Sequence, residues 1–355
     1  MIRRPPASLL DLHDALLLDL DGTLMHGSVP IPHAADAVDR AREQGVSIVF
    51  ATNNASRTPQ QAADHLATVG VTASPEEMAT SPQIAASLLA RRLEPGSTVL
   101  VVGGESLAAQ IRAEGLTAVM EDSPEVVAVV QGWSPDLDWA QLAEGAYAIR
   151  RGAFWMATNV DATLPTEKGM APGNGSMVAA LRHASGAEPA VAGKPEPGMF
   201  EVAAQRVGSR SPLAIGDRLD TDIEGANRAG IHSLLVLTGV SSVLDALRAH
   251  PIQRPTYVMR DLSTLHQPFN LPVVSGEGAR CGRSNAQWDG ENLRLTTSTS
   301  VAPLEDLDAI CAALALLRGT RPNAPWTGTL LDAEGNIIDG PATQDAATQG
   351  PAAQS

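Results

Sequence analysis

Short runs of apolar residues recur along the first 240 positions of the chain. Residues 15–20 read Ala-Leu-Leu-Leu-Asp-Leu, a short apolar run typical of a strand that is buried on both faces. Comparable runs occupy residues 46–51, 99–102, 126–130, 213–215 and 233–237. Because stretches of helical pattern lie between these runs, the sequence predicts an α/β fold with a doubly wound, Rossmann-like parallel sheet.

Two of the intervening helices carry boundary signals. Thr58 directly before Pro59 predicts an N-cap followed by proline in the first turn, and Gly70 predicts the end of a helix over 59–69. Gly230 likewise predicts the end of a helix over 221–229. The polar motifs described next all follow predicted strands, which is where open α/β sheets bind their ligands.

Asp19 and Asp21 end the first predicted strand. Residues two apart in a strand share a face, so the two carboxylates can point at one site. Two like charges at that distance require a nearby cation or a proton, and Gly22 allows the backbone to turn sharply after them. The simpler alternative is an ordinary turn with two solvated aspartates.

Thr52-Asn53-Asn54 follows the second predicted strand, just before a helix. A hydroxyl and free backbone amides at a helix start suit a phosphate, although capping alone would also explain these residues. Lys194, in Gly-Lys-Pro, would add one ammonium group to such a site, whereas an isolated lysine is usually a solvated surface charge.

Asp217 and Asp222 belong to the run Gly-Asp-Arg-Leu-Asp-Thr-Asp, which follows the strand predicted at 213–215. Carboxylates that converge with Asp19 would supply the hard oxygen ligands that Mg²⁺ prefers. The alternative is an acidic loop whose aspartates favour the positive end of the next helix dipole.

Composition narrows the classes of partner. The 355 residues carry a formal charge of −15 and only 3% aromatic residues, without a basic patch, so neither nucleic acid nor an anionic membrane is expected. The start of the chain lacks the apolar run of a signal peptide, and no stretch approaches the ~20 residues that span a bilayer. Cys281 and Cys311 lie far from every motif, and a disulfide between them is an alternative, but a reducing compartment is the simpler interpretation. A cytoplasmic protein is therefore predicted.

Taken in order, the four motifs resemble those of the haloacid dehalogenase superfamily, and the long insert between the second and third resembles its C2-capped phosphatases. Residues 159–165 and 173–176 match the cap signature of that group, which is named for nitrophenyl phosphate and phosphoglycolate. The resemblance implies a core at 1–81 and 189–268 and a C2 cap domain at 82–188. C2-capped relatives often pair through their caps, which makes a homodimer an expectation as well.

The resemblance also implies a role for each motif residue in a Mg²⁺-dependent phosphatase. Asp19 would attack phosphorus to form an aspartyl phosphate, and Asp21 would act as general acid and then as general base. The remaining expected assignments are substrate contacts from Thr52, Asn53, Asn54, Lys194, Asn159 and Asp161, metal ligands from Asp19, the Asp21 carbonyl and Asp217, and an orienting role for Asp222.

Within that group, the chain resembles actinobacterial glycerol 3-phosphate phosphatases, and the resemblance implies a role in recycling of glycerophospholipid polar heads. Short neutral or acidic cap side chains suit a polyol, and only Phe154 and Trp155 lie near enough in sequence to wall a pyridoxal ring. Phosphoglycolate, nucleotides, pyridoxal phosphate, a phosphomutase and a non-catalytic metal-binding scaffold remain alternatives.

The chain continues beyond the motifs. An α+β extension of unknown role is expected over 269–340, with a hairpin turn at 288–291 and an amphipathic helix at 304–317. It is acetyltransferase-like in the relatives, but no glycine-rich pyrophosphate loop is present here. The last stretch, 341–355, is predicted to be disordered.

Overall fold

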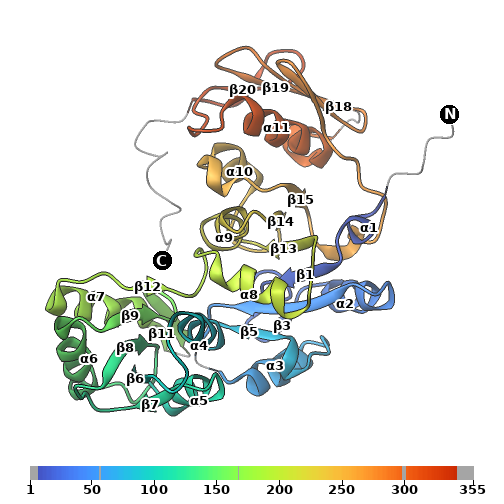
Figure 1. The fold of residues 1–355 in the computed structure, drawn as a ribbon. Helices are drawn as coiled ribbons and strands as arrows, with labels where there is room; N and C mark the ends of the chain where they lie inside the picture. Colours follow the sequence, from blue (N-terminus) through green and yellow to red (C-terminus); the bar gives the residue numbers. More distant parts are fainter. Residues whose placement is uncertain (1–6, 56, 167, 298–300, 342–355) are drawn as a thin grey trace. The chain divides into compact units, whose positions relative to one another are not determined.

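The computed structural model describes residues 7–55, 57–166, 168–297 and 301–341. Its largest α/β sheet has the strand order β15-β14-β13-β1-β4-β5 (Figure 1). The pairs β1–β13, β13–β14, β14–β15 and β4–β5 are parallel, which confirms the predicted class. The strands are β1 (Ala15–Leu18), β4 (Ser47–Thr52), β5 (Met78–Thr80), β13 (Pro212–Gly216), β14 (His232–Val236) and β15 (Tyr257–Met259).

The helices that accompany these strands follow the predicted boundary signals. At the start of α3 (Pro59–Thr68), the Thr58 hydroxyl accepts the Gln61 N–H at 3.2 Å and the Gln61 side chain accepts the Thr58 N–H at 2.9 Å. Gly70 and Gly230 have φ of +84° and +69°, the left-handed conformation that ends helices. The other members are α1 (Leu9–Leu12), α2 (Ala34–Glu43), α8 (Gly198–Arg206), α9 (Glu224–Arg228) and α10 (Val243–Arg248).

The helix predicted at 221–229 differs in its first turn. It begins earlier, as the π-helical segment η2 (Leu219–Ile223), and only Glu224–Arg228 is α-helical. The Arg218 carbonyl accepts the N–H groups of both Asp222 and Ile223, and the Arg218 N–H donates to the Asp222 carboxylate at 3.1 Å. The Asp222 side chain therefore binds the backbone of Arg218, at the start of the turn. Single π-helical turns of this kind are frequent at functional sites.

The chain divides into two compact units. The first comprises Met1–Ile48, Val69–Val71 and Val207–Ser355, and the second comprises Val49–Thr68 and Thr72–Arg206. The domain boundaries expected from the sequence, at 82 and 188, stay a prediction. Short elements complete the described chain: β2 (Met25–His26), β3 (Val29–Pro30), η1 (Pro75–Glu77), η3 (Pro251–Gln253) and η4 (Leu262–Thr264).

A second parallel sheet, of order β12-β9-β8-β6-β7, lies within the second unit. Its strands confirm the runs at 99–102 and 126–130, and it has a core of its own around Leu100, Val129 and Trp155. The elements are β6 (Thr98–Val102), β7 (Thr117–Val119), β8 (Val126–Gln131), β9 (Phe154–Ala157), β12 (Ala190–Val191), the hairpin β10 (Thr163–Thr166) and β11 (Gly169–Pro172), α4 (Ser81–Arg92), α5 (Glu105–Ala113), α6 (Trp139–Arg151) and α7 (Asn174–Ser185).

The C-terminal extension forms a third sheet with a single long helix among its described residues. The predicted hairpin turn joins β18 to β19, and the Asp289 carboxylate accepts the N–H groups of Glu291 and Asn292. The elements are β16 (Val273–Ser275), β17 (Gly278–Cys281), β18 (Ser284–Trp288), β19 (Leu293–Thr296), β20 (Leu330–Leu331), β21 (Ile337–Asp339), η5 (Pro303–Glu305) and α11 (Leu307–Thr320). The tail at 342–355 lies outside the described residues.

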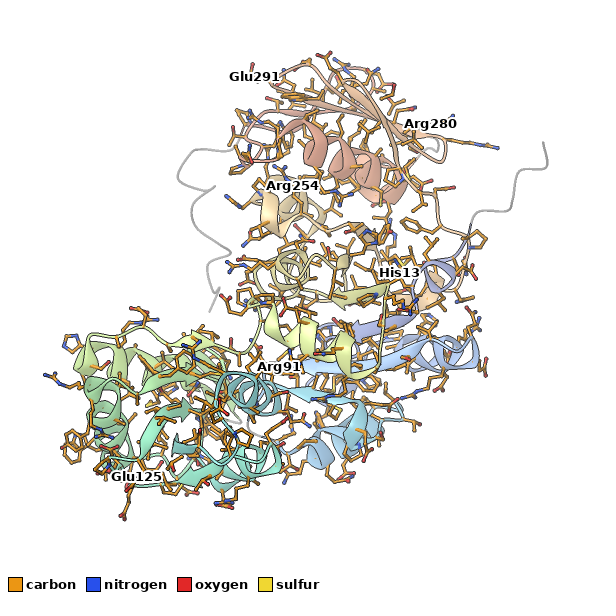
Figure 2. The ribbon with its side chains drawn as sticks, in the orientation of Figure 1. His13, Arg91, Glu125, Arg254, Arg280 and Glu291 are labelled. Carbon is orange, nitrogen blue, oxygen red and sulfur yellow. The ribbon has the colours of Figure 1, made fainter. Side chains whose placement is uncertain are left out.

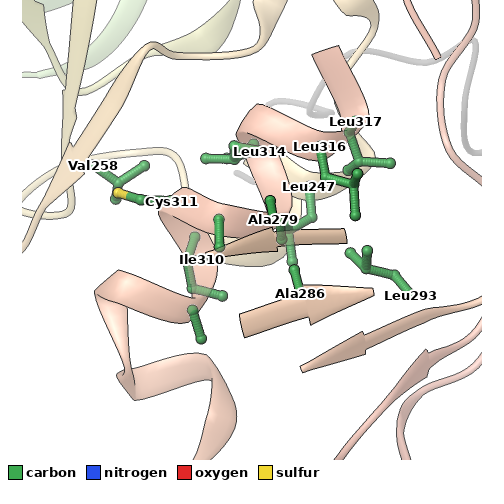
Figure 3. Close-up of a cluster of buried hydrophobic side chains, with 14 of the residues drawn as sticks. Leu247, Val258, Ala279, Ala286, Leu293, Ile310, Cys311, Leu314, Leu316 and Leu317 are labelled. Atoms are coloured by element: carbon green, nitrogen blue, oxygen red, sulfur yellow. The ribbon is translucent and has the colours of Figure 1, made fainter. Parts of the chain in front are cut away.

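The helix expected at 304–317 is not amphipathic. It starts later, at Leu307, and every residue from 309 to 317 is buried. The reason is that α11 packs in one hydrophobic core with the extension's sheet and with α10 and β15 of the first unit, where Cys311 lies next to Val258 (Figure 3). Burial raises the pKa of the Cys311 thiol to about 11, so this free cysteine is a neutral apolar filler.

Arg254 binds the extension to the rest of the first unit. This side chain is almost fully buried, and its guanidinium donates to the carbonyls of Leu317, Arg321 and Ala324 at 2.9, 2.5 and 2.8 Å. Burial, together with the charges of Arg321 and Arg318, lowers the pKa of Arg254 to about 10. The guanidinium thus gives the Leu317 carbonyl a second donor beside the Arg321 N–H, and it binds two carbonyls of the segment that follows α11.

Arg254→Ala should therefore lower the free energy of unfolding by about 3 kcal/mol, because it removes a buried side chain whose guanidinium binds three carbonyls. Arg280, which is exposed at β17 (Figure 2), supplies the control. Arg280→Ala should change the free energy by less than about 0.5 kcal/mol. Urea unfolding measures both, and equal stability of the two variants would show that Arg254 does not fasten the extension.

Candidate active site

Three carboxylates of the first unit gather at one point. Ligand oxygens of Asp19, Asp217 and Asp222 all lie within 4.8 Å of one another. Asp19 follows β1, where its N–H donates to the Ile215 carbonyl at 2.9 Å, and Asp217 follows β13 in the same sheet. Two parallel strand ends and the η2 turn thus bring these side chains together. Asp217 and Asp222 are almost completely buried.

Glycines make room for the buried carboxylates. A Cβ on Gly22 would lie 2.4 Å from the Asp217 carboxylate carbon, and one on Gly239 would lie 2.0 Å from a carboxylate oxygen of the same residue. A Cβ on Gly216 would meet the Asp222 carboxylate carbon at 2.2 Å. No side chain fits at these distances, so each glycine is required for close approach, and Gly22 also has a left-handed φ of +85°.

Backbone groups fix the direction of Asp217. One of its carboxylate oxygens accepts the Val240 N–H at 2.7 Å, and its carbonyl accepts the Ser241 N–H at 3.1 Å. The Thr238 hydroxyl donates to the Gly22 carbonyl at 2.6 Å, which holds the turn after Asp21 against the same loop. Asp21 itself is exposed, and its carboxylate accepts the Gly27 N–H at 3.3 Å.

The donor set fits Mg²⁺. All three side chains offer hard carboxylate oxygens, and three negative charges this close are costly unless a cation lies among them. Magnesium keeps several waters, so the three carboxylates need not all bind it directly. Asp222, expected to orient other groups, stands in the same cluster as Asp19 and Asp217.

The remaining predicted residues belong to the second unit. Thr52 ends β4 and is buried, and its hydroxyl accepts the Asn54 N–H at 3.1 Å. Lys194 is 3% exposed. The Asn53 side chain holds the Lys194 backbone at both of its polar groups, since it accepts the Lys194 N–H at 2.8 Å and donates to the Lys194 carbonyl at 3.0 Å. Sequence reasoning did not find this contact.

The two cap-signature segments lie against each other. The N–H groups of Gly173 and Gly175 donate to the carbonyls of Ala162 and Asp161, each at 2.9 Å. Asn174 donates from its side chain to the Asn159 carbonyl at 2.7 Å. Side chains on the two glycines would collide with this backbone. The signature therefore builds one rigid loop pair that presents Asn159 and Asp161.

These loops line a hollow of about 290 Å³ in the second unit, which we call the Trp133 hollow. Its walls are Asn53, Asn54, Ala55, Trp133, Asn159, Asp161, Thr163, Leu164, Gly173 and Asn174. Trp133 corrects the expectation that Phe154 and Trp155 are the nearby aromatics, because Trp155 is buried in the core of the second sheet. Its position just after β8 was the signal available in the sequence.

Comparison with known proteins agrees with this geometry. The model of the haloacid dehalogenase-like hydrolases matches residues 16–117, and a related hydrolase-like model matches residues 191–265. The chain is 52% identical to the D-glycerol 3-phosphate phosphatase of Mycobacterium tuberculosis over 270 residues, 76% of this chain and 75% of that protein. It is 36% identical to the 5'-nucleotidase YutF of Bacillus subtilis, over 70% of this chain and 95% of that one.

The chain belongs to the haloacid dehalogenase-like hydrolase family. Among solved structures, it is similar to glycerol phosphate phosphatase from Mycobacterium tuberculosis in complex with magnesium, with a TM-score of 0.75 and 43% identity over 92% of this chain and 95% of that one. The match to the Bacillus nucleotidase stops at 70% of this chain. The likeness to the mycobacterial structure thus reaches into the C-terminal extension. None of the helices in the described part of the chain has the length and apolarity to cross a bilayer.

Asp217→Asn should weaken Mg²⁺ binding at least about tenfold, since it removes one charged ligand without changing the size of the side chain. Asp220→Asn is the matched control, because Asp220 lies in the same acidic turn but pairs with Arg218 at 2.8 Å. The readout is the rise of the melting temperature with Mg²⁺ concentration. Equal Mg²⁺ dependence in both variants would contradict the assignment.

Proposed function

We propose that this protein is a Mg²⁺-dependent phosphomonoester hydrolase that forms an aspartyl phosphate on Asp19 and that dephosphorylates glycerol 3-phosphate to glycerol and phosphate. The observation that carries the proposal is the gathering of Asp19, Asp217 and Asp222 within 4.8 Å at strand ends. It comes in a chain that is 52% identical to a D-glycerol 3-phosphate phosphatase.

Asp19 is the nucleophile in this proposal. Its carboxylate attacks phosphorus, the ester oxygen leaves, and water then hydrolyses the aspartyl phosphate. Asp21, whose carboxylate is exposed, gives a proton to the leaving alkoxide and takes one from the incoming water. An alkoxide needs that proton and a halide does not, so Asp21 favours phosphate esters over haloacids.

Lys194 and Thr52 bind the phosphoryl group in the proposed mechanism. The buried Lys194 ammonium offsets negative charge on the phosphoryl oxygens, and the Thr52 hydroxyl and the backbone of Asn53 and Asn54 orient them. Asp19, Asp217 and the Asp21 carbonyl would hold Mg²⁺, which would supply further positive charge for the phosphoryl transfer. Asp222 keeps this ligand set oriented.

The leaving group is proposed to enter the Trp133 hollow. Its volume of about 290 Å³, which includes open solvent, lies at the lower end of the range of roughly 300–1,000 Å³ that suits small-molecule ligands. Its polar walls are short amides, a hydroxyl and Asp161, which can donate to and accept from a polyol. A second carboxylate or phosphate on the substrate would be repelled by Asp161, which disfavours phosphoglycolate and nucleoside diphosphates.

Two other phosphate esters keep specific support. A nucleotide monophosphate is supported by the 36% identity to a 5'-nucleotidase. Pyridoxal phosphate is supported by Trp133, since an aromatic wall is present after all. The 52% identity to a D-glycerol 3-phosphate phosphatase favours glycerol over either ring system.

Cellular location and assembly belong to the same proposal. The free cysteines Cys281 and Cys311 are compatible with the reducing cytoplasm, where we place the protein. A homodimer through the second unit is supported by the exposed Trp139 and Tyr147 on α6. Light scattering of the purified protein measures its mass directly, and a monomer at every concentration would remove the dimer from the proposal.

Initial rates with a panel of phosphate esters test the substrate. Glycerol 3-phosphate should give the highest kcat/KM, at least about tenfold above phosphoglycolate, a nucleotide monophosphate and pyridoxal phosphate, which corresponds to about 1.4 kcal/mol of transition-state binding. Trp133→Ala should lower kcat/KM for pyridoxal phosphate, and so widen its difference from glycerol 3-phosphate, only if the pyridoxal ring contacts Trp133. A tenfold preference for another ester would overturn the glycerol assignment and leave the phosphatase assignment standing.

A further inference from the structure

The Asn53 side chain makes an unusual pair of contacts. Its carbonyl oxygen accepts the N–H of Lys194 and its NH₂ group donates to the carbonyl of the same residue, at 2.8 and 3.0 Å. The Asn53 amide thus binds both the N–H and the carbonyl of Lys194, the same two groups that a neighbouring β-strand would bind. Two bonds to one residue fix both the position and the orientation of the backbone from which the Lys194 side chain extends.

Gly193, the residue before Lys194, leaves the space that the Asn53 side chain occupies. A Cβ on Gly193 would lie 2.6 Å from the Asn53 side-chain oxygen and 2.8 Å from the Thr158 carbonyl, so only glycine admits Asn53 here. The Gly-Lys-Pro motif therefore needs its glycine because both Asn53 and the Thr158 carbonyl approach this position closely. Asparagine is also specific, because the pair of bonds needs one donor and one acceptor, which an aspartate cannot offer.

The Asn53 backbone is fixed in turn. Its carbonyl accepts the Ser81 hydroxyl at 2.8 Å and the Asn159 side chain at 2.9 Å. Asn159 lines the Trp133 hollow, and its own carbonyl is bound by Asn174. One residue therefore connects the ammonium-bearing segment to the loop that would contact the leaving group.

We propose that Asn53 is a positioning residue for Lys194: its side-chain amide sets where the Lys194 ammonium stands, and the Asn159 contact aligns that position with the Trp133 hollow. The inference rests on the proposed function, because Lys194 must act on the phosphoryl group. It gives the Asn53 side chain a role apart from phosphate binding by the backbone, and it accounts for an asparagine directly after Thr52.

A double-mutant cycle tests the inference. Asn53→Ala should lower kcat/KM by about 100-fold, the effect expected of a misplaced catalytic group. Lys194→Ala alone should cost at least as much. In the Lys194→Ala background, adding Asn53→Ala should change kcat/KM less than about threefold, because Asn53 then has no ammonium to place. Independent, additive losses would overturn the inference.

Asn227→Ala is the matched control. Asn227 also holds backbone with its amide, donating to the carbonyls of Ile252 and Arg254 at 2.7 and 2.9 Å, but in the first unit. It should lower the melting temperature and leave kcat/KM within about twofold, with or without Lys194. The same cycle with the isosteric Asn53→Asp, which cannot donate to the Lys194 carbonyl, covers the case in which Asn53→Ala does not fold.

The single variants separate this inference from the proposed function. Wild-type kcat/KM in Lys194→Ala would remove Lys194 from the mechanism, and the inference would fail with that part of the proposed function. Wild-type kcat/KM in Asn53→Ala, together with a large loss in Lys194→Ala, would overturn the inference alone.

Discussion

The mutual repulsion of carboxylates in a small buried space is the constraint on which the rest of the first unit depends. Asp19, Asp217 and Asp222 converge within 4.8 Å, and two of them are almost fully buried. Such an arrangement is stable only when a cation offsets the negative charge and backbone N–H groups donate hydrogen bonds to the carboxylates. The glycines at 22, 216 and 239, the Val240 N–H and the π-helical turn all follow from holding these groups close.

A second constraint acts in the other unit, where a buried lysine needs a defined place. The Lys194 segment is bound by Asn53, and Asn53 is bound by the loop that forms the Trp133 hollow. Neutral amides bind these segments without adding charge near the ammonium. The proposed phosphate contact of Lys194 and the proposed leaving-group hollow are thus linked through one residue, Asn53.

Much of this was available from the sequence. Runs of apolar residues predict buried strands such as β1. Thr58 predicts the start of a helix and Gly70 predicts its end, because capping and a left-handed backbone are properties of single residues. Motif order indicated the family, which the comparisons bear out. The contacts of Asn53 with Lys194, 141 positions away, leave no local signal. Trp133 was missed because a lone aromatic after a strand is ordinary, and α11 was misjudged because its second buried face depends on the tertiary fold.

The central claim is that Asp19 carries the phosphoryl group during turnover. Stopping the reaction with glycerol 3-phosphate and Mg²⁺ within one turnover, followed by peptide mass spectrometry, tests it most directly. The account predicts a phosphate on Asp19, absent in Asp19→Asn, which should remain folded and bind substrate. A phosphate on any other residue, or turnover in Asp19→Asn at the wild-type rate, would contradict it.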